Sequence, residues 1–179
     1  MSKNSLIIII SGKQYSGKDT VADVICETLP GLKREALATA IKNEFGNQKN
    51  LTFNEIDRNK TLYRSDLIEL GNEKRKECPD YWIKKVLMDD GDVVITDVRL
   101  QHEYDTFKKM GAITVRVESD REERLKRGHL VREDDLTETD LDNIKDWDYV
   151  ITNDSDIEAL KNSAAKVALA LEKKLFTKK

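Results

Sequence analysis

Short apolar segments alternate along the chain with longer amphipathic ones. The first apolar segment, residues 6–10, contains no polar residue, which is typical of a strand buried on both faces. Strands are also predicted at residues 92–96, 113–117 and 149–152. Residues 33–37 could begin a helix, but we favour a strand, because a parallel sheet needs a second strand at this point.

The intervening segments have the spacing of amphipathic helices. Helices are predicted at residues 19–29, 39–45, 60–77, 81–88, 100–110, 119–126 and 157–175. Because strands and helices alternate, we predict an α/β fold whose five-stranded, mostly parallel sheet has right-handed crossovers. In such sheets the ligand lies at the carboxyl ends of the strands.

A glycine-bracketed loop joins the first strand to the first helix, with the sequence Gly12-Lys13-Gln14-Tyr15-Ser16-Gly17-Lys18-Asp19. This is the setting of a phosphate-binding P-loop. The glycines let the backbone curl around anionic oxygens, and successive N–H groups and the helix N-terminus point at a phosphate. We therefore predict a nucleotide site whose contacts come from Gly12, Lys13, Ser16, Gly17, Lys18, Asp19 and Thr20.

Candidate metal ligands lie at the start of the first helix and after the strand at 92–96. The residue after the P-loop lysine is normally Ser or Thr, whose hydroxyl binds Mg²⁺, but here it is Asp19, followed by Thr20. A carboxylate at this position can hold the metal directly or through water, and the helix dipole favours its charge. Asp97 follows the strand at 92–96, where P-loop enzymes carry a second acidic residue for Mg²⁺. The alternative is that Asp97 caps the helix that begins near Leu100.

Two clusters of basic residues are candidates for phosphate binding. Lys60, Arg64 and Arg75 lie on one predicted helical segment, and Lys60 and Arg64, four residues apart, share a face of it. The second cluster comprises Arg116, Arg121, Arg124 and Arg127, with Gly128 as a hinge. A basic segment that closes over transferring phosphates would exclude water and offset developing charge. From spacing alone, a solvated charged helix remains an alternative for each cluster.

The acidic stretch 133–142 lacks the glycine and the ligand spacing of a calcium loop, so we interpret it as a solvated lid or a cap-rich connection. His102 and His129 are isolated, and we assign neither a catalytic nor a metal-binding role. Cys26 and Cys78 are expected to be buried, reduced thiols.

The composition of the chain argues against several classes of protein. Of 179 residues 36% are charged, and the net charge of −3 argues against a general nucleic-acid binder. The apolar run at 6–10 is too short to span a membrane and has no signal-peptide cleavage site after it. We therefore expect a cytoplasmic enzyme with one domain over residues 1–179, acting as a monomer or weak dimer.

The order of these motifs over nearly the whole chain resembles the animal-type phosphomevalonate kinases. The resemblance rests on the P-loop, residues 63–66 with Gly71, residues 73–75, 96–99, 111–112 and 114–117, Arg124, Arg127-Gly128, residues 134–135 and 141–143, and residues 147–151 with Asn153. It implies a P-loop kinase fold of three α/β/α layers, with acceptor-binding helices at about 39–90 and a small lid at about 118–145. It also implies transfer of the γ-phosphate of ATP, with Mg²⁺, to the phosphate of 5-phosphomevalonate.

The resemblance also implies residue roles. It places Lys18, Arg116, Arg124, Arg127 and Asn153 on the ATP side, and Lys42, Lys60, Arg64, Arg75 and Arg99 around the acceptor or between the two phosphates. The residues expected to act in catalysis are Lys18, Asp97, Arg99 and Arg127. The metal ligands would be Asp19, Thr20 and Asp97. The chain departs from the family at Leu100, where a second arginine is usual, and this leaves the acceptor open.

A sibling family competes for the acceptor. Phage-type deoxynucleoside monophosphate kinases are similar in the P-loop and at residues 97–99, 102–105, 110–112, 137–138 and 150–154. The pair Lys60 and Arg64 and the lid arginines favour phosphomevalonate, whereas residues 102–103 and 152–154 favour a nucleotide.

The alternative from another class is a nucleotide-dependent switch. Guanine-specific switches normally carry an Asn-Lys-x-Asp element, but here Asn59-Lys60 is followed by Thr61-Leu62.

Overall fold

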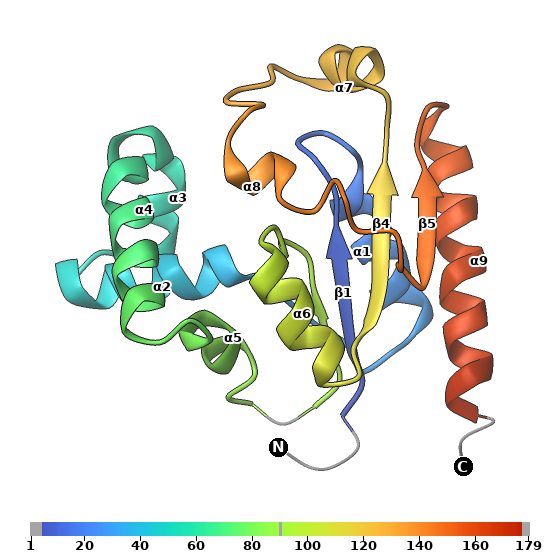
Figure 1. Ribbon diagram of the computed structural model, residues 1–179, viewed down its shortest axis with the longest axis horizontal. Helices are drawn as coiled ribbons and strands as arrows, with labels where there is room; N and C mark the ends of the chain where they lie inside the picture. The colour runs from blue at the N-terminus through green and yellow to red at the C-terminus, as the bar shows by residue number, and fades with distance from the viewer. Residues whose placement is uncertain (1–4, 90, 177–179) are drawn as a thin grey trace. The chain divides into compact units, whose positions relative to one another are not determined.

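The computed structural model describes residues 5–89 and 91–176 (Figure 1). The described residues form two compact units, one over residues 35–89 and one over residues 5–34 and 91–176. The units are described separately below.

The larger unit is built on a sheet of five strands within the described residues: β1 (Ile7–Ser11), β2 (Lys33–Glu35), β3 (Val93–Ile95), β4 (Ile113–Glu118) and β5 (Tyr149–Thr152). The strand order is β2-β3-β1-β4-β5, and β1 pairs in parallel with both β3 and β4. The last pair, β4 with β5, is also parallel. The predicted α/β fold and its strands are confirmed, including the ambiguous strand at β2.

Five helices of the described chain accompany this sheet: α1 (Lys18–Thr28), α6 (Gln101–Lys109), α7 (Arg121–Arg127), α8 (Leu136–Thr139) and α9 (Ile157–Phe176). Helices α1 and α9 pack together against one sheet face through a cluster that includes Ile8, Ile25 and Leu160. Side chains alternate across a strand, so Ile9 lies on the opposite face, where Figure 1 shows α6 in front of the sheet. Burying each of these side chains contributes about 1.5–3 kcal/mol.

The smaller unit consists of α2 (Leu37–Lys49), α3 (Phe53–Arg58), α4 (Lys60–Glu77) and α5 (Tyr81–Val86). Its buried side chains include Phe45, Ile56 and Trp82. The indole N–H of Trp82 donates to the carbonyl oxygen of Gly71 across 3.0 Å, which joins α5 to α4. This bond satisfies the one polar atom that the buried indole brings into the core.

The structure differs from the sequence-based predictions at three points. Helix α3 was not predicted, although Thr52 and Glu55 form a capping box at its start. Helix α8 was also missed, since a single turn is too short to show a helical period. Cys26 and Cys78 are free thiols, as expected, but both are partly exposed rather than buried.

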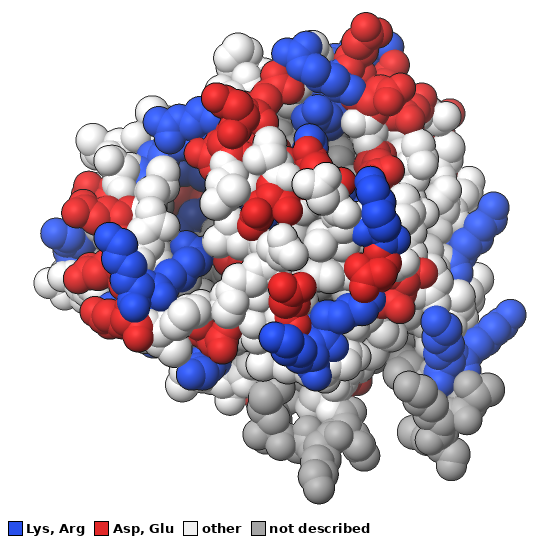
Figure 2. Space-filling view, viewed as in Figure 1, with Lys and Arg blue, Asp and Glu red and all other residues white. Residues whose placement is uncertain are grey.

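Lys and Arg side chains lie among Asp and Glu side chains over most of the face shown in Figure 2. Within the described residues, no helix combines the length and the apolar character that a membrane crossing requires.

Candidate functional site

The P-loop connects β1 to α1 through a tightly turned backbone. Tyr15 and Gly17 adopt left-handed conformations, with φ of 59° and 96°. A Cβ atom on Gly12 would lie 2.4 Å from the Ser16 hydroxyl and 2.6 Å from the carbonyl oxygen of Val117, so a side chain cannot be accommodated there. Gly12 is required by this close approach, and Gly17 by its positive φ.

Two P-loop side chains fit an anion. The hydroxyl of Ser16 is fully buried and, within the described part of the chain, has no hydrogen-bond partner. Leaving such a group unpaired costs about 1–3 kcal/mol, which an anionic ligand would remove. Burial lowers the pKa of Lys18, whose ammonium lies 3.7 Å from the Asp19 carboxylate. A buried ammonium gains strongly from an incoming phosphate, so these residues suit a nucleoside triphosphate.

Asn153 fixes the P-loop from the end of β5. Its side-chain amide donates to the carbonyl oxygen of Ser16 across 2.8 Å, and its backbone N–H bonds to the Glu118 carbonyl at the end of β4. The Asn153 side chain is therefore engaged with the protein backbone. It was predicted as a nucleotide contact, and in the structure its side chain bonds the backbone of the P-loop.

Two of the predicted lid arginines reach the same loop. Arg124 is buried and its guanidinium lies 3.4 Å from the carbonyl oxygen of Gln14. Arg127 donates to the carbonyl oxygen of Tyr15 across 3.2 Å and to that of Asn153 across 2.8 Å. The structure thus brings both arginines to the P-loop.

Gly128, which we expected to be a hinge, has an extended backbone that any residue adopts. A Cβ atom at this position would nevertheless lie 2.2 Å from the ring of Tyr15. The close approach of the Tyr15 ring is the structural reason for glycine here. The hinge stays a prediction.

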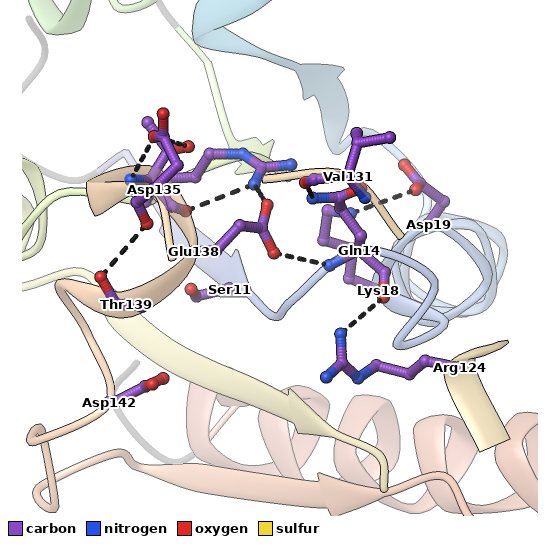
Figure 3. Close-up of polar contacts among 12 residues, drawn as sticks. Ser11, Gln14, Lys18, Asp19, Arg124, Val131, Asp135, Glu138, Thr139 and Asp142 are labelled. Atoms are coloured by element: carbon purple, nitrogen blue, oxygen red, sulfur yellow. Dashed lines mark hydrogen bonds and ion pairs between the residues drawn. The ribbon is translucent and has the colours of Figure 1, made fainter. Parts of the chain in front are cut away.

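Glu138 of α8 points at the P-loop (Figure 3). Its carboxylate accepts a hydrogen bond from the backbone N–H of Gln14 across 3.0 Å and pairs with the guanidinium of Arg99. The side chain of Glu138 is only 5% exposed. Our expectation of a solvated acidic stretch is therefore wrong at this residue. The alternative of a cap-rich connection is confirmed at Asp135, which caps α8 by accepting from the N–H of Thr137.

Asp142 forms a second contact of this kind. Its carboxylate lies 2.6 Å from the ammonium of Lys13 and 3.2 Å from the guanidinium of Arg116. Arg116 is buried, and its guanidinium also contacts Ser11 and lies 5.7 Å from the centre of the Trp147 ring. Neither Glu138 nor Asp142 was predicted as a site residue.

The predicted metal ligands do not form a ready-made metal site. Asp19 is exposed and pairs with Arg34, a residue that sequence reasoning missed, and Thr20 follows it on α1. Among the described residues, no cluster of three or more His, Cys, Asp or Glu side chains suits a metal ion. Mg²⁺ commonly uses one or two carboxylates together with substrate phosphates and water, so Asp19 and Asp97 are consistent with such a site.

Asp97 is not the cap of α6. The N-cap residue of that helix is Leu100, and the Glu103 carboxylate accepts from the N–H groups of Arg99 and Leu100 at 3.1 and 3.2 Å. The capping alternative for Asp97 is therefore wrong. The negative charge of Asp97 acts on Lys18, whose pKa it raises against the larger effect of burial.

The four remaining predicted residues lie in the smaller unit. Lys42 pairs with Asp57 at 2.5 Å and lies 5.0 Å from the centre of the Phe53 ring. The hydrogen bond from Lys42, with smaller contributions from the charges of Lys42 and Lys60, lowers the pKa of Asp57, so these three residues form one cluster. Arg64 is exposed on α4, and Arg75 is partly buried on the same helix.

Two family models match this chain. The phosphomevalonate kinase model matches residues 10–112, more than half of the chain, and the deoxynucleotide monophosphate kinase model matches residues 75–164, half of it. The chain belongs to these two kinase families. Both resemblances stated from the sequence are thereby confirmed. The protein is a nucleotide-dependent phosphotransferase, so the alternative of a non-catalytic switch is not retained.

Solved structures similar to this kinase have the same fold. Shikimate kinase from Aquifex aeolicus aligns with a TM-score of 0.57 and 18% identity, over 96% of this chain and 99% of that one. A gluconokinase from Sinorhizobium meliloti aligns with 0.57 and 17%, over 97% of each chain. The APS kinase from Mycobacterium tuberculosis, solved with AMPPNP and APS, aligns with 0.55 and 16%, over 94% and 98%. At such identities the likeness shows the P-loop kinase fold and no more.

Proposed function

We propose that this kinase transfers the γ-phosphate of ATP to the phosphate of 5-phosphomevalonate. One observation carries the choice of acceptor. The phosphomevalonate kinase match includes the P-loop and the whole segment that holds Lys42, Lys60 and Arg64, whereas the deoxynucleotide monophosphate kinase match begins at residue 75. All five residues expected to bind the acceptor phosphate therefore lie within the phosphomevalonate kinase match, and only Arg75 and Arg99 lie within the other match as well.

On the donor side, the P-loop would hold the phosphates of ATP. The unpaired hydroxyl of Ser16 and the desolvated ammonium of Lys18 support this assignment. Arg116, Arg124 and Arg127 add positive charge beside the loop, and Asn153 holds the loop in shape. Mg²⁺, held by Asp19, Thr20 and Asp97, would neutralise phosphate charge when bound.

On the acceptor side, little covalent help is needed. A phosphate is already a nucleophile at neutral pH, so the protein must align two anions and offset their repulsion. We assign that role to Lys42, Lys60, Arg64, Arg75 and Arg99. This assignment requires no general base.

A deoxynucleoside monophosphate is the second candidate acceptor. It is favoured by the deoxynucleotide monophosphate kinase match over residues 75–164, which contains β4, the lid segment and β5. Leu100, where phosphomevalonate kinases usually have an arginine, also favours a deoxynucleoside monophosphate as the acceptor.

Coupled ADP release with Mg-ATP tests the proposal. 5-Phosphomevalonate and each nucleoside and deoxynucleoside monophosphate would be supplied separately. Rapid turnover with 5-phosphomevalonate alone is expected. Turnover with a deoxynucleotide alone would replace the first proposal by the second. We further propose a cytoplasmic monomer or weak dimer, and sedimentation at several concentrations would test the oligomeric state.

A further inference from the structure

The lid segment places carboxylates on groups that suit phosphate. Glu138 accepts from the backbone N–H of Gln14, one of the P-loop amides, and pairs with Arg99. Asp142 pairs with Lys13 and Arg116. Backbone N–H groups of a P-loop and neighbouring cations are the donors that recognise a phosphate.

The pairing of Glu138 explains how a carboxylate tolerates burial at this place. An ionised carboxylate that is 5% exposed is costly unless charged or polar donors satisfy it. The Gln14 N–H and the Arg99 guanidinium supply such donors. The ammonium of Lys18 also interacts electrostatically with the Glu138 carboxylate. The P-loop thus binds a carboxylate of the same chain, that of Glu138.

The space beside Glu138 is too small for a phosphate. The cavity bounded by Ser11, Gly12, Lys13, Arg99, Arg116 and Glu138 has a volume of about 10 Å³. A cavity of this size holds about one water molecule, whereas a phosphate group has four oxygens around its phosphorus. The Glu138 carboxylate occupies the Gln14 N–H and the Arg99 guanidinium, so a phosphate can bond these two donors only if Glu138 moves away.

We propose that Glu138 is an internal competitor for the phosphate site, whose carboxylate must leave the P-loop before a nucleotide binds. We take Asp142 to leave with it, because only three residues separate the two along the chain. The inference rests on the proposed binding of ATP phosphates by the P-loop. Binding then exchanges one carboxylate for a more highly charged phosphate, and the apparent affinity is reduced by the fraction of molecules in which Glu138 is still in place.

Binding of AMPPNP and of inorganic tripolyphosphate, measured by titration calorimetry on the full chain, tests the proposal. The variant Glu138→Gln keeps the shape of the side chain, removes its charge and turns an amide N–H towards the donors. We expect its Kd for both probes to fall about tenfold. The matched control is Glu123→Gln, a lid carboxylate that pairs with Lys126 at the surface, and its Kd should equal that of the wild type.

The alternative is that Glu138 positions Arg99 for catalysis. In that case Glu138→Gln would bind the probes equally or more weakly, and the proposal would be overturned. If neither the wild type nor the variant binds AMPPNP or tripolyphosphate, the proposed nucleotide site fails as well. Equal binding by both proteins would overturn only the role of Glu138.

Hydrogen exchange on the wild type provides a test that does not depend on the folding of a variant. The N–H groups of Glu138 and Asp140 are hydrogen-bonded within α8, to the carbonyl oxygens of Asp135 and Leu136. If tripolyphosphate displaces Glu138, exchange at these amides should become faster when the probe is added. Slower or unchanged exchange would contradict displacement.

Discussion

The side-chain amide of Asn153 donates a hydrogen bond to the carbonyl oxygen of Ser16 across 2.8 Å, over a sequence separation of 137 residues. Asn153 is buried, and a Cβ atom on Gly17 would lie 2.5 Å from its nitrogen. The last strand of the sheet therefore sets the path of the P-loop backbone. The shape of the anion site therefore depends on Asn153, which lies far along the chain from the P-loop motif.

Replacing Asn153 with Ala should loosen the loop. Loss of a buried hydrogen bond that leaves the Ser16 carbonyl unpaired costs about 1–3 kcal/mol, so we expect a lower melting temperature and a Kd for AMPPNP at least about fivefold higher. Calorimetry and thermal unfolding would measure both. The control, Asn162→Ala on the exposed face of α9, should change neither quantity. A normal Kd in Asn153→Ala would show that the loop keeps its shape without this bond.

Lys18→Met should abolish turnover and leave the fold intact. Phosphoryl transfer depends on neutralising charge, so we expect coupled ADP release to fall at least about a thousandfold, as expected for loss of a central electrostatic group. The control Lys161→Met removes an exposed lysine paired with Glu158 and should retain full turnover. Substantial activity in Lys18→Met would refute the assignment.

The same variant tests the effect of pH on stability. Burial lowers the pKa of Lys18 below 10.5, so the folded enzyme binds fewer protons than the unfolded chain. The charged ammonium therefore reduces stability below the folded pKa, and the penalty disappears as the pH rises towards 10.5. We expect Lys18→Met to melt at a higher temperature than the wild type at neutral pH, with the difference shrinking at alkaline pH. A difference that is independent of pH would contradict this account.

Arg64→Ala should weaken the acceptor far more than ATP. A charge-assisted hydrogen bond to phosphate contributes about 1.5–3 kcal/mol, so the acceptor KM should rise at least about tenfold while the ATP KM changes little. Steady-state kinetics with each substrate varied in turn would separate the two. Arg58→Ala, at the exposed end of α3, is the matched control in the same unit. An unchanged acceptor KM would remove Arg64 from the acceptor site.

Gly128→Ala should separate the lid from the P-loop. The new Cβ would overlap the Tyr15 ring at 2.2 Å, although the extended backbone of Gly128 tolerates alanine. We expect a higher ATP KM, because the clash is relieved by moving either the ring of the P-loop residue Tyr15 or the segment that carries Arg127, and both contact the P-loop. In a Tyr15→Ala background the clash is absent, and Gly128→Ala should then have little further effect. Equal effects in both backgrounds would mean that glycine is needed here for another reason.

The sequence by itself determined the features that depend on neighbouring residues. The P-loop could be recognised because strand, glycine loop and helix follow one another directly. Strands β1, β3, β4 and β5 could be placed from their apolar runs and helix α9 from its helical period, whereas β2, Lys33-Arg34-Glu35, was placed only because a parallel sheet needs a strand there. Helix α3 could also have been predicted, because Thr52 and Glu55 are typical of a helix start. Its six residues are, however, too few to show a helical period.

Only the tertiary structure decided which charges meet. Glu138 pairs with Arg99 and Asp142 with Lys13, although these partners lie 39 and 129 residues apart in the chain. An acidic stretch has the same local pattern whether water or an arginine neutralises it, so burial of Glu138 left no trace in the sequence. Coulomb interactions and desolvation depend on distances in space, and those distances exist only once the sheet has brought the ends of its strands together.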